Sequence, residues 1–344
     1  MIVAKPLTVA ESVSRVRRTT FPALRLCRQD SVVSSSVVQV SLQDLSPGEV
    51  VIESRYSSVN HKDALAVTGT ADVVRQFPRI AGIDVAGVVI ESEDSRFAVG
   101  SEVVCTNFGM GVEHDGGYAA YCRVPGDWVV PLDPRLSLRE SMILGTAGLT
   151  AALAIRELET NGLAPHGGKV VVNGATGGVG MLLVDILSAS GYEVVAMTGR
   201  PEHASLLRRL GAADVIGTPP PQGAAKPLEQ SMWAAAFDSV GGEQLAWLAR
   251  TVRPGGVIAS FGNAGGNQLS LTVLPFILRG IRIIGINVRT LSVATRSQLW
   301  RRLADGYRPR FLEAIATMVP LDGVIDACHS LLQRRCVGRI VLQL

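Results

Sequence analysis

Short apolar runs separated by turn residues occupy the first part of the chain. Glu49–Ser54, Val85–Ile90 and Ser101–Cys105 are rich in valine and lie between glycine, proline and aspartate positions. Several short strands of this kind predict a β-rich domain, a sandwich or a barrel, over residues 21–143.

From about Leu144 the pattern changes, and apolar strands alternate with helical segments. The predicted strands are Lys169–Asn173, Glu193–Thr198, Ala235–Val240, Val257–Phe261 and Ile281–Ile286. This alternation predicts an α/β fold with a doubly wound parallel sheet over residues 144–287. A last strand at Arg339–Gln343 indicates that residues 288–344 return to complete the β-rich domain.

The composition is that of a globular protein with a sizeable core, because 47% of the residues are apolar and 18% are charged. The net charge is +3, and the first twenty residues supply all of it through four basic residues against Glu11. The other charges balance, which disfavours nucleic acid as a principal partner. No uninterrupted apolar stretch reaches the roughly 18 residues of a membrane span. We expect a soluble cytoplasmic protein with a disordered extension over residues 1–20.

The five cysteines are scattered and form no C-x-x-C pair. A disulfide framework or a thiolate zinc cluster would need closer, paired spacing. We interpret them as small buried residues of a reducing compartment.

The clearest chemical signal is a glycine-rich turn between a predicted strand and a predicted helix. Its spacing is G-x-x-G-x-x-G, and the absent side chains would let a pyrophosphate approach the N–H groups at the helix start. This context predicts a Rossmann dinucleotide site. The residues expected to contact the cofactor there are Gly174, Thr176, Gly177, Gly178, Val179 and Gly180.

The next strand ends in Thr198, Gly199 and Arg200, with no acid at the turn. An NAD site places a carboxylate there for the ribose hydroxyls, whereas a guanidinium can bind the 2′-phosphate of NADP. The sequence therefore favours NADPH, with all three residues in the site. The alternative is that Arg200 is only a solvated loop residue.

Taken together, several motifs resemble the medium-chain dehydrogenase/reductase superfamily, in its zinc-free quinone oxidoreductase division and nearest the acrylyl-CoA reductase type. In chain order they are Ser57-Ser-Val-Asn-His-Lys-Asp-Ala, Gly82-Ile-Asp-Val-Ala-Gly, Asn173-Gly-Ala-Thr-Gly-Gly-Val-Gly, Thr198-Gly-Arg and Pro275-Phe-Ile-Leu-Arg. The resemblance runs from about Phe21 to the end. It implies that the β-rich part is a GroES-like catalytic domain.

The resemblance also implies site residues. Asn60 and His61 would lie near the nicotinamide as catalytic residues, and Asp63 would order their loop or serve only as a turn carboxylate. His61 stands where this type usually has tyrosine, so the pH dependence or the substrate choice differs if that residue polarises the substrate. Ala264, Leu278 and Arg339 would lie near the cofactor. Arg339 is equally compatible with a surface charge at a strand start.

Zinc chemistry is not expected. In zinc-dependent relatives a cysteine stands where Asn60 does, and a His-Glu pair follows the glycine that corresponds to Gly82. Here Ile83 and Asp84 follow that glycine, so both the thiolate and the imidazole ligand are missing.

Three functions remain open. The first is NADPH-dependent reduction of the activated C=C of a 2-enoyl-CoA such as acrylyl-CoA, and the second is NADPH:quinone reduction. The third, of another class, is a non-catalytic NADPH-binding sensor or structural protein. Six arginines between residues 289 and 310 would suit the phosphates of CoA or form a solvated helix face. The apolar edge Ile281–Ile286 predicts a homodimer.

Overall fold

The computed structural model describes residues 19–219 and 226–344, which form two compact units. The first unit contains the described residues up to Thr146, with Ser292–Ser297 and Ala316–Leu344. The second contains Ala147–Leu291 and Gln298–Ile315. The expected disordered extension falls outside the described residues at positions 1–18.

This division differs from the expected ranges at residues 144–146, which fall in the first unit, and at residues 288–291 and 298–315, which fall in the second unit. The reason is polar anchoring within that unit. Tyr307 donates a hydrogen bond to Glu159 at 2.5 Å, and Arg310 pairs with Asp185 at 2.9 Å.

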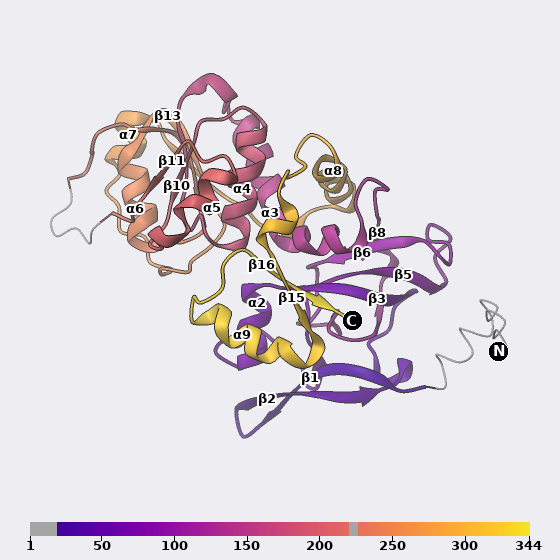
Figure 1. Ribbon diagram of the computed structural model, residues 1–344. Coiled ribbons are helices and arrows are strands. Elements are labelled where there is room, and N and C mark those ends of the chain that lie inside the picture. Colours follow the sequence, from indigo (N-terminus) through magenta and orange to yellow (C-terminus); the bar gives the residue numbers. More distant parts are fainter. Residues whose placement is uncertain (1–18, 220–225) are drawn as a thin grey trace. The chain divides into compact units, whose positions relative to one another are not determined.

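The first unit contains two sheets (Figure 1). Its strands are β1 Phe21–Gln29, β2 Val32–Val40, β3 Val50–Val59, β4 Arg79–Ile80, β5 Asp84–Ser92, β6 Glu102–Thr106, β7 Tyr121–Val124, β8 Val130–Pro131, β15 Ala316–Pro320 and β16 Arg339–Gln343. The larger sheet has the order β15-β16-β3-β5-β6-β8, and β7 also pairs with β3. Its pairs are antiparallel except β15 with β16. In the smaller sheet β1 pairs with both β2 and β4.

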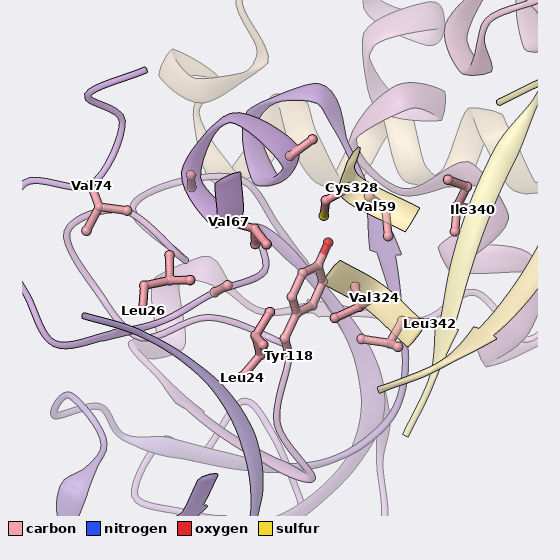
Figure 2. Close-up of a cluster of buried hydrophobic side chains, with 13 residues drawn as sticks. Leu24, Leu26, Val59, Val67, Val74, Tyr118, Val324, Cys328, Ile340 and Leu342 are labelled. Carbon is pink, nitrogen blue, oxygen red and sulfur yellow. The ribbon is translucent and has the colours of Figure 1, made fainter. Parts of the chain in front are cut away.

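Two helices, α2 (His61–Thr68) and α9 (Val324–Leu332), pack against each other beside this unit's core. Figure 2 shows Tyr118 in the middle of the cluster, with Val67 from α2 and Cys328 from α9 close by. Tyr118 is fully buried, and its hydroxyl donates to the Ser58 carbonyl at 3.2 Å. The core thus extends to the start of α2.

The second unit is a six-stranded parallel sheet in the order β11-β10-β9-β12-β13-β14. Its strands are β9 Val170–Val172, β10 Val194–Met197, β11 Asp214–Ile216, β12 Trp233–Asp238, β13 Val252–Ser260 and β14 Arg282–Gly285. Its shorter helices are α4 Gly178–Ala189, α5 Ala204–Arg209, α6 Gly242–Thr251 and α7 Leu274–Arg279. Figure 1 shows α4 and α6 on opposite sides of the strands. The predicted doubly wound fold is confirmed.

The remaining helices are α3 (Leu138–Thr160) and α8 (Val293–Ala304). By length and composition α3 could cross a membrane, but 72% of its most apolar window is buried inside the protein. Its backbone also breaks at Gly145, with φ 48° and ψ −149°. Burial and a break of this kind are typical of a core helix.

Candidate active site

The predicted glycine-rich turn joins β9 to α4 in the second unit. Gly177 is the N-cap of α4 and has no side chain to cap the N–H groups of the first turn. A Cβ on Gly180 would lie 2.4 Å from the Gly174 carbonyl oxygen, so only glycine lets the helix start so close to the turn. Unsatisfied N–H groups and the helix dipole make such a terminus attractive to a phosphate. Thr176, Gly178 and Val179 lie in the same turn and helix start.

The end of β10 meets this turn through hydroxyl groups. The Arg200 guanidinium donates to the Thr176 hydroxyl at 2.5 Å, and the Arg200 backbone N–H donates to the Thr198 hydroxyl at 3.1 Å. The two hydroxyl oxygens are 3.3 Å apart. The next acid along the chain, Glu202, faces His203 at 3.6 Å. The structure therefore brings the residues predicted at 174–180 and at 198–200 together.

Sequence reasoning missed a buried polar group at the neighbouring strand ends. Asn173 donates from its amide to the Asp238 carboxylate at 2.6 Å and accepts from the Ser239 backbone N–H at 2.8 Å. Asp238 also accepts from the Gly241 N–H at 3.0 Å. The signal was a polar pair, Asp238-Ser239, directly after a buried strand and before two glycines. Ligands bind at this edge of a parallel sheet, and Asn173 and Asp238 lie fully buried there.

The two other positions expected near the cofactor lie on exposed segments of the same unit. Ala264 lies in the loop after β13, and Leu278 lies on α7 with 62% of its surface exposed. Their role toward a cofactor stays a prediction.

In the first unit, Asn60 and Asp63 form the start of α2. Asn60 is the N-cap, and its backbone N–H donates to the Asp63 carboxylate at 2.9 Å. The other carboxylate oxygen of Asp63 accepts from the Ile83 N–H at 2.8 Å. Asp63 is 1% exposed. Burial, and then the charge of Asp84, raise the pKa of Asp63 to about 7.

The side-chain amide of Asn60 is held by three charged residues. It donates to the Asp84 carboxylate at 2.8 Å and to the Asp63 carboxylate at 3.2 Å, and its oxygen accepts from Arg339 at 3.3 Å. Both amide hydrogens of Asn60 therefore face carboxylates of the protein, and its catalytic role stays a prediction.

Arg339 lies inside this unit and is not a surface charge. It is 4% exposed, and its Nε donates to the Ile143 carbonyl at 2.9 Å. Burial lowers the pKa of this guanidinium, while Asp84 raises it. Arg339 thus supports Asn60 from the strand behind it.

His61 is the first residue of α2 and keeps an exposed side. Partial burial, followed by the charge of Arg334, lowers the pKa of His61 below the usual range of histidine. At neutral pH the ring is therefore neutral, with one N–H donor and one acceptor.

The residues at this position do not fit zinc. The Asn60 amide is engaged by carboxylates, Ile83 is apolar, and Asp84 is enclosed by hydrogen-bond donors. Within residues 19–219 and 226–344, no group of three or more His, Cys, Asp or Glu side chains could hold a metal ion.

The arginine-rich segment serves internal contacts in part. Arg296 is fully buried, donates to the Thr106 carbonyl at 2.9 Å and lies 3.9 Å from the centre of the Phe108 ring. Arg310 pairs with Asp185, as described above. Arg296 therefore does not belong to a solvated face, whereas the Arg310 side chain keeps 43% of its surface exposed. The proposed basic surface for CoA loses Arg296.

Family models match both parts of the chain. The alcohol dehydrogenase GroES-like domain matches residues 46–134, and the zinc-binding dehydrogenase domain matches residues 178–305. The chain belongs to the medium-chain dehydrogenase/reductase superfamily, which confirms the resemblance seen in its motifs.

Relatives at 40% identity or more include a quinone oxidoreductase and acrylyl-CoA reductases. The YhfP protein of Bacillus subtilis (strain 168), named provisionally as a quinone oxidoreductase, is 43% identical over 95% of this chain and 99% of its own length. The acrylyl-CoA reductase AcuI of Ruegeria pomeroyi is 41% identical over 90% of this chain and 94% of its own. The yhdH oxidoreductase of Salmonella enterica, crystallised with NADP, is 40% identical with a TM-score of 0.91, covering 94% of this chain and 99% of its own. YhfP, crystallised with NAD, has a TM-score of 0.92, covering 95% of this chain and 100% of its own.

Proposed function

We propose that this protein is an NADPH-dependent, zinc-independent reductase that transfers hydride to the activated C=C of a 2-enoyl-CoA such as acrylyl-CoA. The observation that carries the cofactor assignment is the Arg200 guanidinium on the Thr176 hydroxyl, at a strand end without a carboxylate. The similarity to AcuI supports the substrate class.

The second unit has the groups that NADPH requires. The uncapped first turn of α4 would hold the pyrophosphate, and Arg200 would bind the 2′-phosphate through its fork of donors. Asp238 and Asn173 hold the strand ends beside that turn in a fixed arrangement. NADPH, when bound, supplies the hydride.

The first unit would supply the donor for the substrate. Addition of hydride to the β-carbon places negative charge on the thioester oxygen, and a fixed N–H donor stabilises that charge. We assign this role to the neutral ring of His61, because Asn60 is engaged by Asp63 and Asp84. The α-carbon would then take its proton from solvent or from a side chain.

Quinone reduction is the second candidate, and the 43% identity to YhfP favours it. NADPH oxidation with acrylyl-CoA and with 1,4-benzoquinone, each at matched concentration, separates the two. Faster turnover of acrylyl-CoA supports the first proposal, and faster turnover of benzoquinone supports the second. Tight NADPH binding without turnover of either acceptor would leave the non-catalytic binding protein.

We further propose a cytoplasmic homodimer. Cys27, Cys105, Cys122 and Cys328 are free thiols, which suits a reducing compartment. In the second unit β14 is an edge strand, and α7 beside β13 exposes apolar side chains.

A further inference from the structure

Asp84 lies at the centre of the polar group around Asn60. It is 0% exposed, and its carboxylate accepts from the Ser58 hydroxyl at 2.5 Å, the Asn60 amide at 2.8 Å, and the Thr146 N–H and hydroxyl at 2.9 and 2.6 Å. These donors come from β3, from the start of α2 and from α3. One buried carboxylate therefore fixes three elements at one point.

The backbone at Gly145 packs closely against this group. A Cβ on Gly145 would lie 2.6 Å from an Asp84 oxygen and 2.7 Å from the Ser58 hydroxyl, so the backbone of α3 closes over the carboxylate. The Asn60 amide then has one orientation, with its N–H groups toward carboxylates and its oxygen toward Arg339.

We infer that Asp84 is a positioning residue of the reaction, which acts on the substrate through Asn60 and the adjacent His61. Asp84 fixes the N-cap residue of α2, and the N-cap fixes the backbone from which the His61 ring projects. The expected effect of Asp84 on the reaction rate rests on the proposed function. Misplacing a donor by about 1 Å can lower a rate about 100-fold.

The test compares Asp84→Asn with Asp115→Asn in the full chain. Asp115 is the matched control, because it is also a buried carboxylate of the first unit, with donors from Ser46, Arg79 and Ile80 but no contact to Asn60. We expect Asp84→Asn to lower kcat about 10–100-fold with the Kd for NADPH within about twofold. Asp115→Asn should lower the melting temperature and leave kcat within about twofold.

A double-mutant cycle with His61→Phe shows whether Asp84 acts through His61. In the His61→Phe background the loss from Asp84→Asn should shrink to less than about threefold. Equal losses in both backgrounds, or an equal loss from Asp115→Asn, would overturn the inference. If Asp84→Asn does not fold, Asn60→Ala takes its place in the same cycle.

A second readout needs no turnover. With ring-labelled histidine and His61→Gln for assignment, NMR follows the His61 signal through a pH titration. Asp84→Asn should shift the His61 pKa, whereas Asp115→Asn should leave it in place. If the wild type reduces neither acceptor, this shift still supports the positioning role while the proposed function fails. An unmoved signal refutes the positioning role.

Discussion

Arg200 is the residue whose replacement tests the cofactor assignment most directly. Arg200→Ala should raise the Kd for NADPH about 10–150-fold, because a charge-assisted contact contributes about 1.5–3 kcal/mol. The Kd for NADH should change little, since NADH has no 2′-phosphate. Fluorescence titration measures both, with Arg209→Ala, an exposed arginine of α5, as the control. Equal affinities of the wild type for the two cofactors would contradict the assignment.

Asp63 makes the stability of the first unit depend on pH. Its pKa is raised from the ordinary 3.8 to about 7, so the folded protein binds this proton more tightly than the unfolded chain. The protonation of Asp63 contributes up to about 4 kcal/mol to the free energy of unfolding. This contribution is complete below pH 4 and is lost as the pH rises to about 7. Urea unfolding at pH 4.5 and 7.5 should show a loss in the wild type that is smaller in Asp63→Asn. The same loss of stability in both proteins would mean that other titrating groups cause it.

At this scale the sequence predicted the identity of the site residues better than their contacts. Asn60 and Asp63 were found through one local motif, whereas Asp84 and Thr146 lie 24 and 62 positions from the residues they bind. Their hydrogen bonds arise from strand pairing and from the break in α3, which no local pattern contains. The contacts of Asn60 with Asp84 and Arg339 were not predictable for this reason.

Gly145 is the element-scale feature that brings α3 onto Asp84. Gly145→Ala should destabilise the protein by about 2–5 kcal/mol, because alanine is strained at φ 48°, ψ −149° and its Cβ would overlap buried oxygens. Gly162→Ala is the control, since Gly162 has φ +99° with nothing near the new Cβ. Thermal unfolding should show a smaller loss for the control. Equal losses would mean that backbone strain alone, and not the contact with Asp84, explains the effect.

Strands and helices with a clear pattern of apolar residues were predictable from the sequence. Elements that depend on tertiary contacts were not. The strands β9 and β12 and the segment Val257–Ala259 of β13 are almost fully buried, so each is visible as a continuous apolar run. β15 is half-exposed along its length, and among the described strands it pairs only with β16; its sequence carries no such run. The segment 298–315 groups with the second unit because Tyr307 and Arg310 bind residues more than 120 positions away, and no local pattern indicates these contacts.

At the scale of the whole molecule, the chain lacks the thiolate and imidazole ligands of a catalytic zinc ion. We therefore expect that turnover survives chelation. Dialysis against EDTA should leave NADPH oxidation unchanged, because Asn60 and Ile83 cannot replace a thiolate and an imidazole. The rate before and after dialysis is the measurement, with metal analysis of both samples as its control. Activity that disappeared with EDTA and returned with zinc would contradict the metal-free site.

Exposed apolar side chains on α7 and at the residue before it predict how two molecules associate. β14 ends the parallel sheet, and α7 and the residue before it expose Val273, Ile277 and Leu278 by 62–69%. A second copy that pairs along β14 would supply hydrogen-bond partners for the backbone groups of this edge strand. The same pairing around a two-fold axis would cover the exposed apolar side chains. Light scattering should therefore give twice the 36.4 kDa chain mass at micromolar concentration.

Ile277→Asp should shift this mass toward the monomer while circular dichroism stays unchanged, because a carboxylate in an apolar interface loses its hydration without a partner. Val32→Asp is the matched control, since Val32 is 68% exposed in the first unit against 69% for Ile277. Its mass should equal that of the wild type. A monomeric wild type would refute the dimer. Dissociation by Val32→Asp alone would indicate that the interface lies at the β1–β2 hairpin.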